Sequence, residues 1–213
     1  MVTVAALFAA VTIGATGCSG QKSAAVAPLV SATSRTGSSP APGATSAAVP
    51  GAASAPDVKA AQLARSTPVR LQIASIGVDS TLMSLGLRTD GSMEVPAGGF
   101  PAGWYSGGPT PGQLGPAVIA GHVDMNGPGV FYRLHDLKTG DQVTVIRADG
   151  AKPVFRVTRV QQFLKNQFPT KLVYGNIDHA GLRLITCGGT FNSQTGHYED
   201  NLVVFADLIT PAR

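Results

Sequence analysis

The stretch from Asp141 to Val160 decides the fold class of this chain. It reads Asp141-Gln-Val-Thr-Val-Ile-Arg147, then Ala-Asp149-Gly150-Ala-Lys-Pro, then Val154-Phe-Arg-Val-Thr-Arg-Val160. Both outer segments alternate apolar and polar residues, which is the pattern of a strand with one buried face. The Asp149-Gly150 pair is a strong hairpin signal because both residues tolerate a positive φ. The stretch therefore predicts an antiparallel hairpin in a β-rich domain.

Further strands are predicted on both sides of this hairpin. Val69–Ile76 alternates in the same way, and Pro116–Gly121 is a short continuous apolar run that suits a fully buried strand. Leu182–Cys187 and Leu202–Ala206 have the pattern of two more strands. Many short strands separated by Gly/Pro turns predict a mainly β fold that closes, or nearly closes, into a barrel.

One short helix is expected between these strands. In Val130–Leu137, the apolar residues Phe131, Leu134 and Leu137 would lie on one helical face. No long amphipathic helix and no internal repeat is visible in the sequence.

Length and charge narrow the function classes. The chain has 213 residues, enough for one domain with appendages, and only 13% of them are charged. Its formal net charge is +4, but the basic residues of the β-rich part stand singly between apolar ones. Because no Lys/Arg run tracks a phosphate backbone, nucleic-acid binding is not expected. The basic excess fits mild attraction to an anionic membrane or wall surface, or simply a solvated surface.

The N-terminal residues, 1–20, have the composition of an export segment. An apolar run shorter than a bilayer span leads to Ala15-Thr-Gly-Cys18, which resembles a bacterial lipobox with Cys18 as the lipidated residue. The third residue before the cysteine is Ala rather than Leu, and no Lys or Arg precedes the apolar run. A lipoprotein anchor, an uncleaved signal anchor and a secreted form therefore all remain open.

Residues 21–66 differ in composition from the rest. Ala, Ser, Pro, Gly and Thr dominate them, so they have too little bulky apolar surface to offset the entropy of ordering. We expect a disordered spacer that lets a folded domain, residues 67–213, reach above a membrane.

Cys187 and His122 are the two candidates for chemistry. With Cys18 in the export segment, Cys187 is an unpaired thiol in an exported domain, so it is buried, paired between molecules, or reactive. It closes a predicted strand and is followed by Gly188-Gly189, which would let a substrate backbone approach. His122 likewise follows a predicted buried strand. A thiol nucleophile needs such an imidazole to exchange its proton.

Several motifs, taken together and in this order, resemble the class F sortases of high-GC Gram-positive bacteria. Leu184-Ile-Thr-Cys187 resembles the sortase signature Leu-x-Thr-Cys, and Gly121-His122 resembles the sortase histidine. The resemblance covers about Pro68 to Leu208. The other matching segments are Gly103-Trp-Tyr105, Gly108-Pro-Thr-Pro-Gly112, Gly115–Asp124, Phe168-Pro-Thr170, Leu182–Gly189 and Gly196–Asn201.

The resemblance implies a closed eight-stranded β-barrel with short helices and a cysteine transpeptidase. Cys187 would attack the Thr–Gly bond of a Leu-Pro-x-Thr-Gly-like sorting signal, and His122 would protonate the leaving amine. An amine acceptor, either a cell-wall precursor or a pilin lysine, would then resolve the thioacyl enzyme. The implied enzyme is a monomer that needs no metal or cofactor and acts at the outer face of the cell membrane.

The sequence departs from the family at a third residue, an Arg that steadies the oxyanion. No Lys or Arg occurs between Cys187 and Arg213. Arg183 is the best internal candidate, because it lies four residues before Cys187 and would share a strand face with it. Asn201 is the alternative, as a neutral donor. Thr186, Gly188, Asn201 and His197 are expected to bind substrate.

Three other interpretations remain open at this point. An L,D-transpeptidase is also an exported cysteine enzyme, but its motif follows closely after its histidine, whereas Cys187 lies far from His122. A non-enzymatic lipoprotein binding module would simply bury Cys187. A degenerate sortase fold would bind sorting peptides without turning them over, as the missing downstream Arg would permit.

Overall fold

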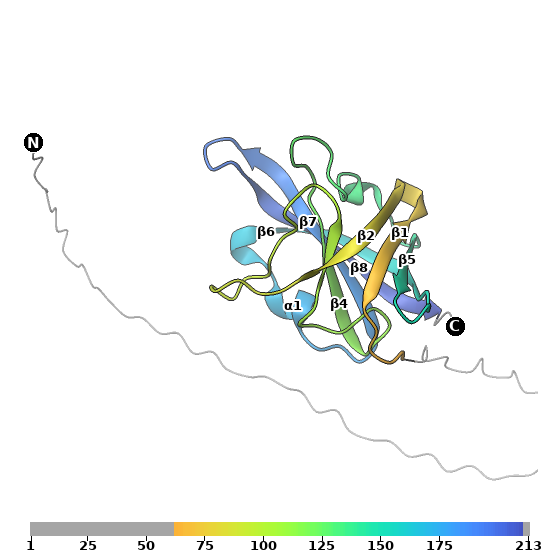
Figure 1. Cartoon of the computed structure of the whole chain (residues 1–213). Helices are drawn as coiled ribbons and strands as arrows, with labels where there is room; N and C mark the ends of the chain where they lie inside the picture. Colours follow the sequence, from red (N-terminus) through yellow and green to blue (C-terminus); the bar gives the residue numbers. More distant parts are fainter. Residues whose placement is uncertain (1–61, 211–213) are drawn as a thin grey trace, which may run out of the picture. The chain divides into compact units, whose positions relative to one another are not determined.

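The hairpin expected around Asp149-Gly150 is present in the computed structural model of the protein, which describes residues 62–210 (Figure 1). β5 (Gln142–Arg147) pairs antiparallel with β6 (Val154–Leu164). Of the two turn residues, only Gly150 has a positive φ, at 83°. The predicted export segment, 1–20, and residues 21–61 of the predicted spacer lie outside the described residues.

A closed barrel is built from the eight strands of the described residues, as the sequence predicted. Around the barrel the order is β1-β2-β3-β4-β7-β8-β6-β5, and β5 pairs with β1 to close it. The β2–β3 and β4–β7 pairs are parallel, and the others are antiparallel. The remaining strands are β1 (Pro68–Ile73), β2 (Val78–Leu85), β3 (Ala102–Tyr105), β4 (Gly115–Ala120), β7 (Ala180–Asn192) and β8 (His197–Thr210).

The helices of the described residues are all short. They are the 3-10 turns η1 (Ala74–Ile76), η2 (Leu134–Asp136) and η3 (Lys165–Gln167), and the single-turn helix α1 (Thr170–Tyr174). Within the described part of the chain, no helix is long and apolar enough to cross a membrane.

Two details of the predicted secondary structure are wrong. Val130–Leu137 is not one helix but a run of turns ending in η2, although Phe131, Leu134 and Leu137 are all buried. Turns suffice to bury these side chains because each contacts the barrel core directly. The strand predicted to end at Cys187 instead continues to Asn192, where it forms a hairpin with β8 that extends beyond the barrel (Figure 1).

Apolar side chains form two layers, and these explain the continuous apolar run of β4. The larger cluster fills the barrel interior and includes Ala117 and Ile119. The smaller cluster, which includes Val118 and Val173 of α1, covers the outside of the same strand. All six residues of β4 are buried because both faces of the strand are covered.

Residues 62–66, which the sequence places in the spacer, are held against the barrel by hydrogen bonds. The buried guanidinium of Arg147 donates to the carbonyl of Ala64 at 2.6 Å and to that of Pro111 at 2.8 Å. It also forms an ion pair with Asp149. Arg147 thereby fixes the point at which the chain enters the barrel.

Candidate active site

His122, two residues after β4, and Cys187, within β7, lie at equivalent positions along two neighbouring parallel strands. In the β4–β7 register, Ala120 lies opposite Ile185, and the N–H of Gly121 donates to the carbonyl of Ile185 at 3.0 Å. His122 and Cys187 each lie two residues further on. Because side chains repeat every two residues along an extended chain, both point to the face that Ala120 and Ile185 occupy.

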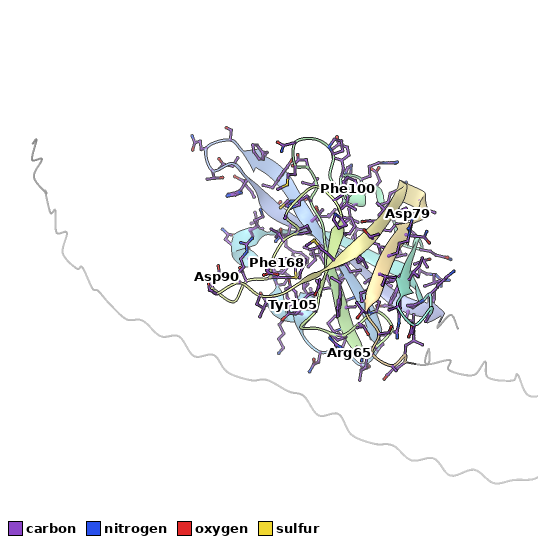
Figure 2. The ribbon with its side chains drawn as sticks, viewed as in Figure 1. Arg65, Asp79, Asp90, Phe100, Tyr105 and Phe168 are labelled. Atoms are coloured by element: carbon purple, nitrogen blue, oxygen red, sulfur yellow. The ribbon has the colours of Figure 1, made fainter. Side chains whose placement is uncertain are left out.

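One cavity of about 650 Å³ contains both side chains. Both are partly buried and reach the cavity surface, so the Cys187 thiol is not enclosed by the core. The cavity lies on the α1 side of the barrel, and its lining includes Tyr105 and Phe168, both labelled in Figure 2. Its other lining residues are Leu87, Gly91, Ser92, Met93, Val95, Pro96, Ala120, Gly121, Lys165, Thr170, Tyr174, Ile185, Thr186 and Asn201.

The loop after β2 fixes the proton position on the His122 ring. Nε2 of His122 lies 2.8 Å from the carbonyl oxygen of Pro96. A carbonyl only accepts hydrogen bonds, so Nε2 carries the hydrogen and donates it. In the neutral imidazole, Nδ1 is therefore the nitrogen left to accept a proton.

A tight turn fixes the backbone of His122. The N–H of Phe131 donates to the His122 carbonyl at 3.0 Å. Gly129 packs against the same carbonyl so closely that a Cβ at this position would lie 2.3 Å from its oxygen. Only glycine fits there, and its lack of a Cβ lets the backbone of the turn pack directly against the backbone of His122.

Arg183 shares a strand face with Cys187, but its guanidinium is directed away from the cavity. Nη1 donates to the carbonyl of Leu182 at 3.0 Å, and the guanidinium carbon lies 4.8 Å from the centre of the Phe205 ring. Burial lowers the pKa of Arg183 below its usual value. The side chain is 5% exposed and is absent from the described cavity lining. The structure thus does not bring Arg183 to Cys187.

The expected substrate-binding residues fall into two groups. Thr186 and Asn201 line the cavity with Cys187, and Asn201 pairs with Cys187 across β7 and β8. Gly188 does not line it, and His197 lies exposed at the turn end of the β7–β8 hairpin, where it pairs with Asn192. The proposed lipidation residue, Cys18, lies outside the described residues.

Two residues of the site were missed by sequence reasoning. Nζ of Lys165 donates to Sγ of Cys187 at 3.6 Å. The hydroxyl of Tyr198 donates to a carboxylate oxygen of Asp124 at 2.5 Å, which ties the β7–β8 hairpin to the loop after His122. This bond raises the pKa of Tyr198 above its usual value. No local pattern marks Lys165, whereas Tyr198 lies in the quoted segment Gly196–Asn201.

The charged groups of the described residues do not form a metal centre. No group of three or more His, Cys, Asp or Glu side chains in the described part of the chain is placed to hold an ion. What the arrangement offers instead is a thiol, an imidazole and an ammonium around an apolar cavity.

The chain is similar to known proteins in sequence and in fold. The family model described as a Sortase domain matches residues 71–209. No curated protein matches the sequence. Among solved structures, a lid mutant of sortase A from Corynebacterium diphtheriae is similar, with 22% identity and a TM-score of 0.52 over 69% of this chain and 72% of that one.

Two streptococcal structures are similar to the same degree. The pilus-related sortase C of Group B Streptococcus has 16% identity and a TM-score of 0.52, covering 70% of this chain and 69% of that one. Sortase C of Streptococcus pneumoniae has 18% identity and a TM-score of 0.52, covering 68% of each chain. At these identities, the likeness is one of fold.

Proposed function

Because the chain belongs to the sortase family, a family of cysteine transpeptidases, we propose that Cys187 is its nucleophile and His122 its acid/base group. The observation that carries this proposal is the parallel β4–β7 register, which directs both side chains into one cavity. The mostly apolar wall of that cavity suits an extended peptide with apolar side chains.

The proposed reaction has two steps. The Cys187 thiol gives its proton to His122, the sulfur attacks the carbonyl carbon of the scissile peptide bond, and a tetrahedral oxyanion forms. When the carbon–nitrogen bond breaks, His122 protonates the departing amine and a thioester to Cys187 remains. An incoming amine then attacks the thioester and gives its proton to His122, which passes it to the Cys187 sulfur as the carbon–sulfur bond breaks.

Asn201 is placed to donate to the oxyanion, because it lines the cavity beside Cys187. Backbone N–H groups near Cys187 are further candidates. For Arg183 to contribute, its guanidinium would have to leave the Leu182 carbonyl and the Phe205 ring. We therefore propose Asn201, in preference to Arg183, as the side chain that donates a hydrogen bond to the oxyanion. Thr186, Gly188 and His197 stay proposed substrate contacts, the first at the cavity and the others beyond it.

The proposed substrate is a Leu-Pro-x-Thr-Gly-like sorting signal of a surface protein, cut between Thr and Gly. The acceptor is an amine at the cell surface, such as a cell-wall precursor or a pilin lysine. Cys18 would anchor the chain to the outer face of the membrane, with residues 21–61 as a spacer. The motif set of the sequence assigns the chain to class F. These finer points rest on the motifs and not on the comparisons.

The test is to incubate the full chain with a panel of sorting peptides, with and without an added amine. We expect an acyl-enzyme at Cys187, detected by intact mass and removed by hydroxylamine, together with a new amide product when the amine is present. Cys187→Ala should form neither. Absence of both species across the whole panel would contradict the proposal.

A further inference from the structure

Lys165 reaches the candidate nucleophile from a strand that is not adjacent to it. It directly follows β6, and the end of β6 pairs with β8 at Leu164 and Asp200. Since β8 also pairs with β7, Lys165 approaches Cys187 across β8. The contact it makes is direct, because Nζ lies 3.6 Å from Sγ and donates to it.

The charge of Lys165 is unbalanced at this point. Among the described residues that line the cavity, it is the sole Lys, Arg, Asp or Glu. Within the described residues, no carboxylate comes within ion-pair distance of its Nζ. Asp200, on the facing strand, instead accepts a hydrogen bond from Gln162. The ammonium is thus free to respond to negative charge that appears at the sulfur.

The cations nearest to Cys187 along the chain do not take this position. No Lys or Arg follows Cys187 until Arg213, and the guanidinium of Arg183 is buried against Phe205. The exposed Lys165 side chain keeps its ammonium at the cavity mouth, where water screens it in the free enzyme. A bound peptide would cover the mouth, displace water and strengthen its field at the sulfur.

We propose that Lys165 is a catalytic residue that supplies the positive charge of this site. Negative charge develops first on the Cys187 sulfur and then on the carbonyl oxygen of the substrate, both within reach of a flexible lysine side chain. An ammonium beside them stabilises both states relative to the neutral ground state. This inference rests on the proposed function for its reaction, but the charge effect on the sulfur is measurable without any turnover.

The first experiment compares the rates at which Cys187 of the full chain reacts with an anionic and a cationic methanethiosulfonate reagent. Cys18 is replaced by Ser in every variant, so that one thiol reacts. A unit charge about 6 Å from the reagent changes the anionic-to-cationic rate ratio about tenfold. We expect Lys165→Met to lower this ratio by about that factor, and Lys165→Arg to retain it. Lys171→Met is the matched control, since this exposed lysine of α1 does not line the cavity.

The second experiment measures peptide cleavage by the same variants. Lys165→Met should lower kcat/KM about 10²-fold, as loss of an oxyanion donor does, with Lys165→Arg recovering most of it. An unchanged reagent ratio in Lys165→Met overturns the proposal, whatever the activity. A lowered ratio with wild-type kcat/KM also overturns it, because the charge would then not act in catalysis. If the wild type cleaves no peptide but the ratio falls, the proposed function fails while the electrostatic pairing stands.

Discussion

The two ends of the buried part of β7, residues 180–186, place charged and titratable groups together in different ways. At the start, His179 lies between two carboxylates, with Nδ1 2.9 Å from Asp178 and Nε2 3.0 Å from Asp207. Beyond the buried half of the strand, Cys187 has a single ammonium, that of Lys165, at 3.6 Å. In both arrangements a titratable group lies next to a charged one: the His179 imidazole lies next to carboxylates, and the Cys187 thiol lies next to an ammonium.

The difference lies in what each arrangement leaves free. Both ring nitrogens of His179 are bonded, and its carbonyl accepts the N–H of Gly115, so this end joins β7 to β4 and β8. At the other end, the sulfur faces a cavity and the ammonium has no described ion-pair partner. Full pairing at one end serves stability, and incomplete pairing at the other leaves groups available for chemistry.

The strongest test of this contrast is His122→Ala at the cavity end. Removing an acid/base group typically lowers the rate by about 10²–10⁴-fold, and we expect kcat/KM for a cleaved sorting peptide to fall by this amount. The melting temperature should stay close to that of the wild type, because the ring is only partly buried. Steady-state cleavage and thermal unfolding measure the two quantities.

His135→Ala is the control for this substitution, since His135 is exposed on η2 and its side chain contacts Asp136, away from the cavity. It should leave kcat/KM within twofold. Equal losses in the two variants, or a large fall in melting temperature for His122→Ala alone, would mean that the histidine at the cavity serves structure.

A smaller effect is expected from Tyr198→Phe, which removes the link between the β7–β8 hairpin and Asp124. Asp124 lies two residues after His122, so losing the bond should loosen the loop that carries the imidazole. A hydrogen bond worth about 1 kcal/mol corresponds to a fall in kcat of about fivefold. Stopped-flow or steady-state cleavage at saturating peptide gives the value.

The control is Tyr132→Phe, which alters an exposed tyrosine in the turn between His122 and η2. Its kcat should match the wild type. Wild-type kcat in Tyr198→Phe as well would show that the hairpin does not position the histidine.

The strand pattern of the sequence was enough to predict the parts of the fold that obey one simple period. The β5–β6 hairpin and the buried β4 were predicted because alternation and continuous burial leave direct traces in the residue types. β3 was missed because it is four residues long and contains Gly103, which weakens a strand signal. That glycine is needed in the fold, since a Cβ there would lie 2.5 Å from the Leu85 side chain.

The sequence was enough to predict only those parts of the site whose positions follow from the predicted strands. Cys187 and His122 each come directly after an apolar run that is visible in the sequence, so their common location could be inferred. Lys165 could not be, because its approach depends on the β6–β8 pairing and on a register shift between Val157 and Arg159. For Arg183 the shared face was correct, but a side chain's direction along the strand is decided by tertiary partners, here Leu182 and Phe205.

Arg183→Met tests the middle of the buried part of β7, between the two ends compared above. The Nε atom of Arg183 is buried without a hydrogen-bond partner among the described residues, so its charge is poorly compensated. Replacing such a buried charge with an apolar side chain of similar length is often neutral or stabilising. We expect the free energy of unfolding to stay unchanged or rise by about 1 kcal/mol in denaturant titration, with kcat/KM within threefold of the wild type. A tenfold or larger loss of kcat/KM with unchanged stability would return the oxyanion role to Arg183.

The smallest effect is expected at the start of β7, from the pH dependence of His179. Hydrogen bonding to Asp178, followed by that to Asp207, raises the pKa of His179 above its usual value of about 6.5. A raised pKa in the folded state means that the charged imidazole stabilises the fold fully below about pH 6.5, and that this contribution is lost as pH rises through the folded-state pKa. The His179 side chain is 44% exposed, and solvent screening limits the contribution to about a few tenths of a kcal/mol.

Urea titrations of the wild type and His179→Gln should therefore differ more at pH 5.5 than at pH 9, and 1 M salt should shrink the difference. A difference that grows with pH would mean that the two carboxylates do not stabilise the charged ring, and the contrast between the two ends of the buried part of β7 would lose its electrostatic basis.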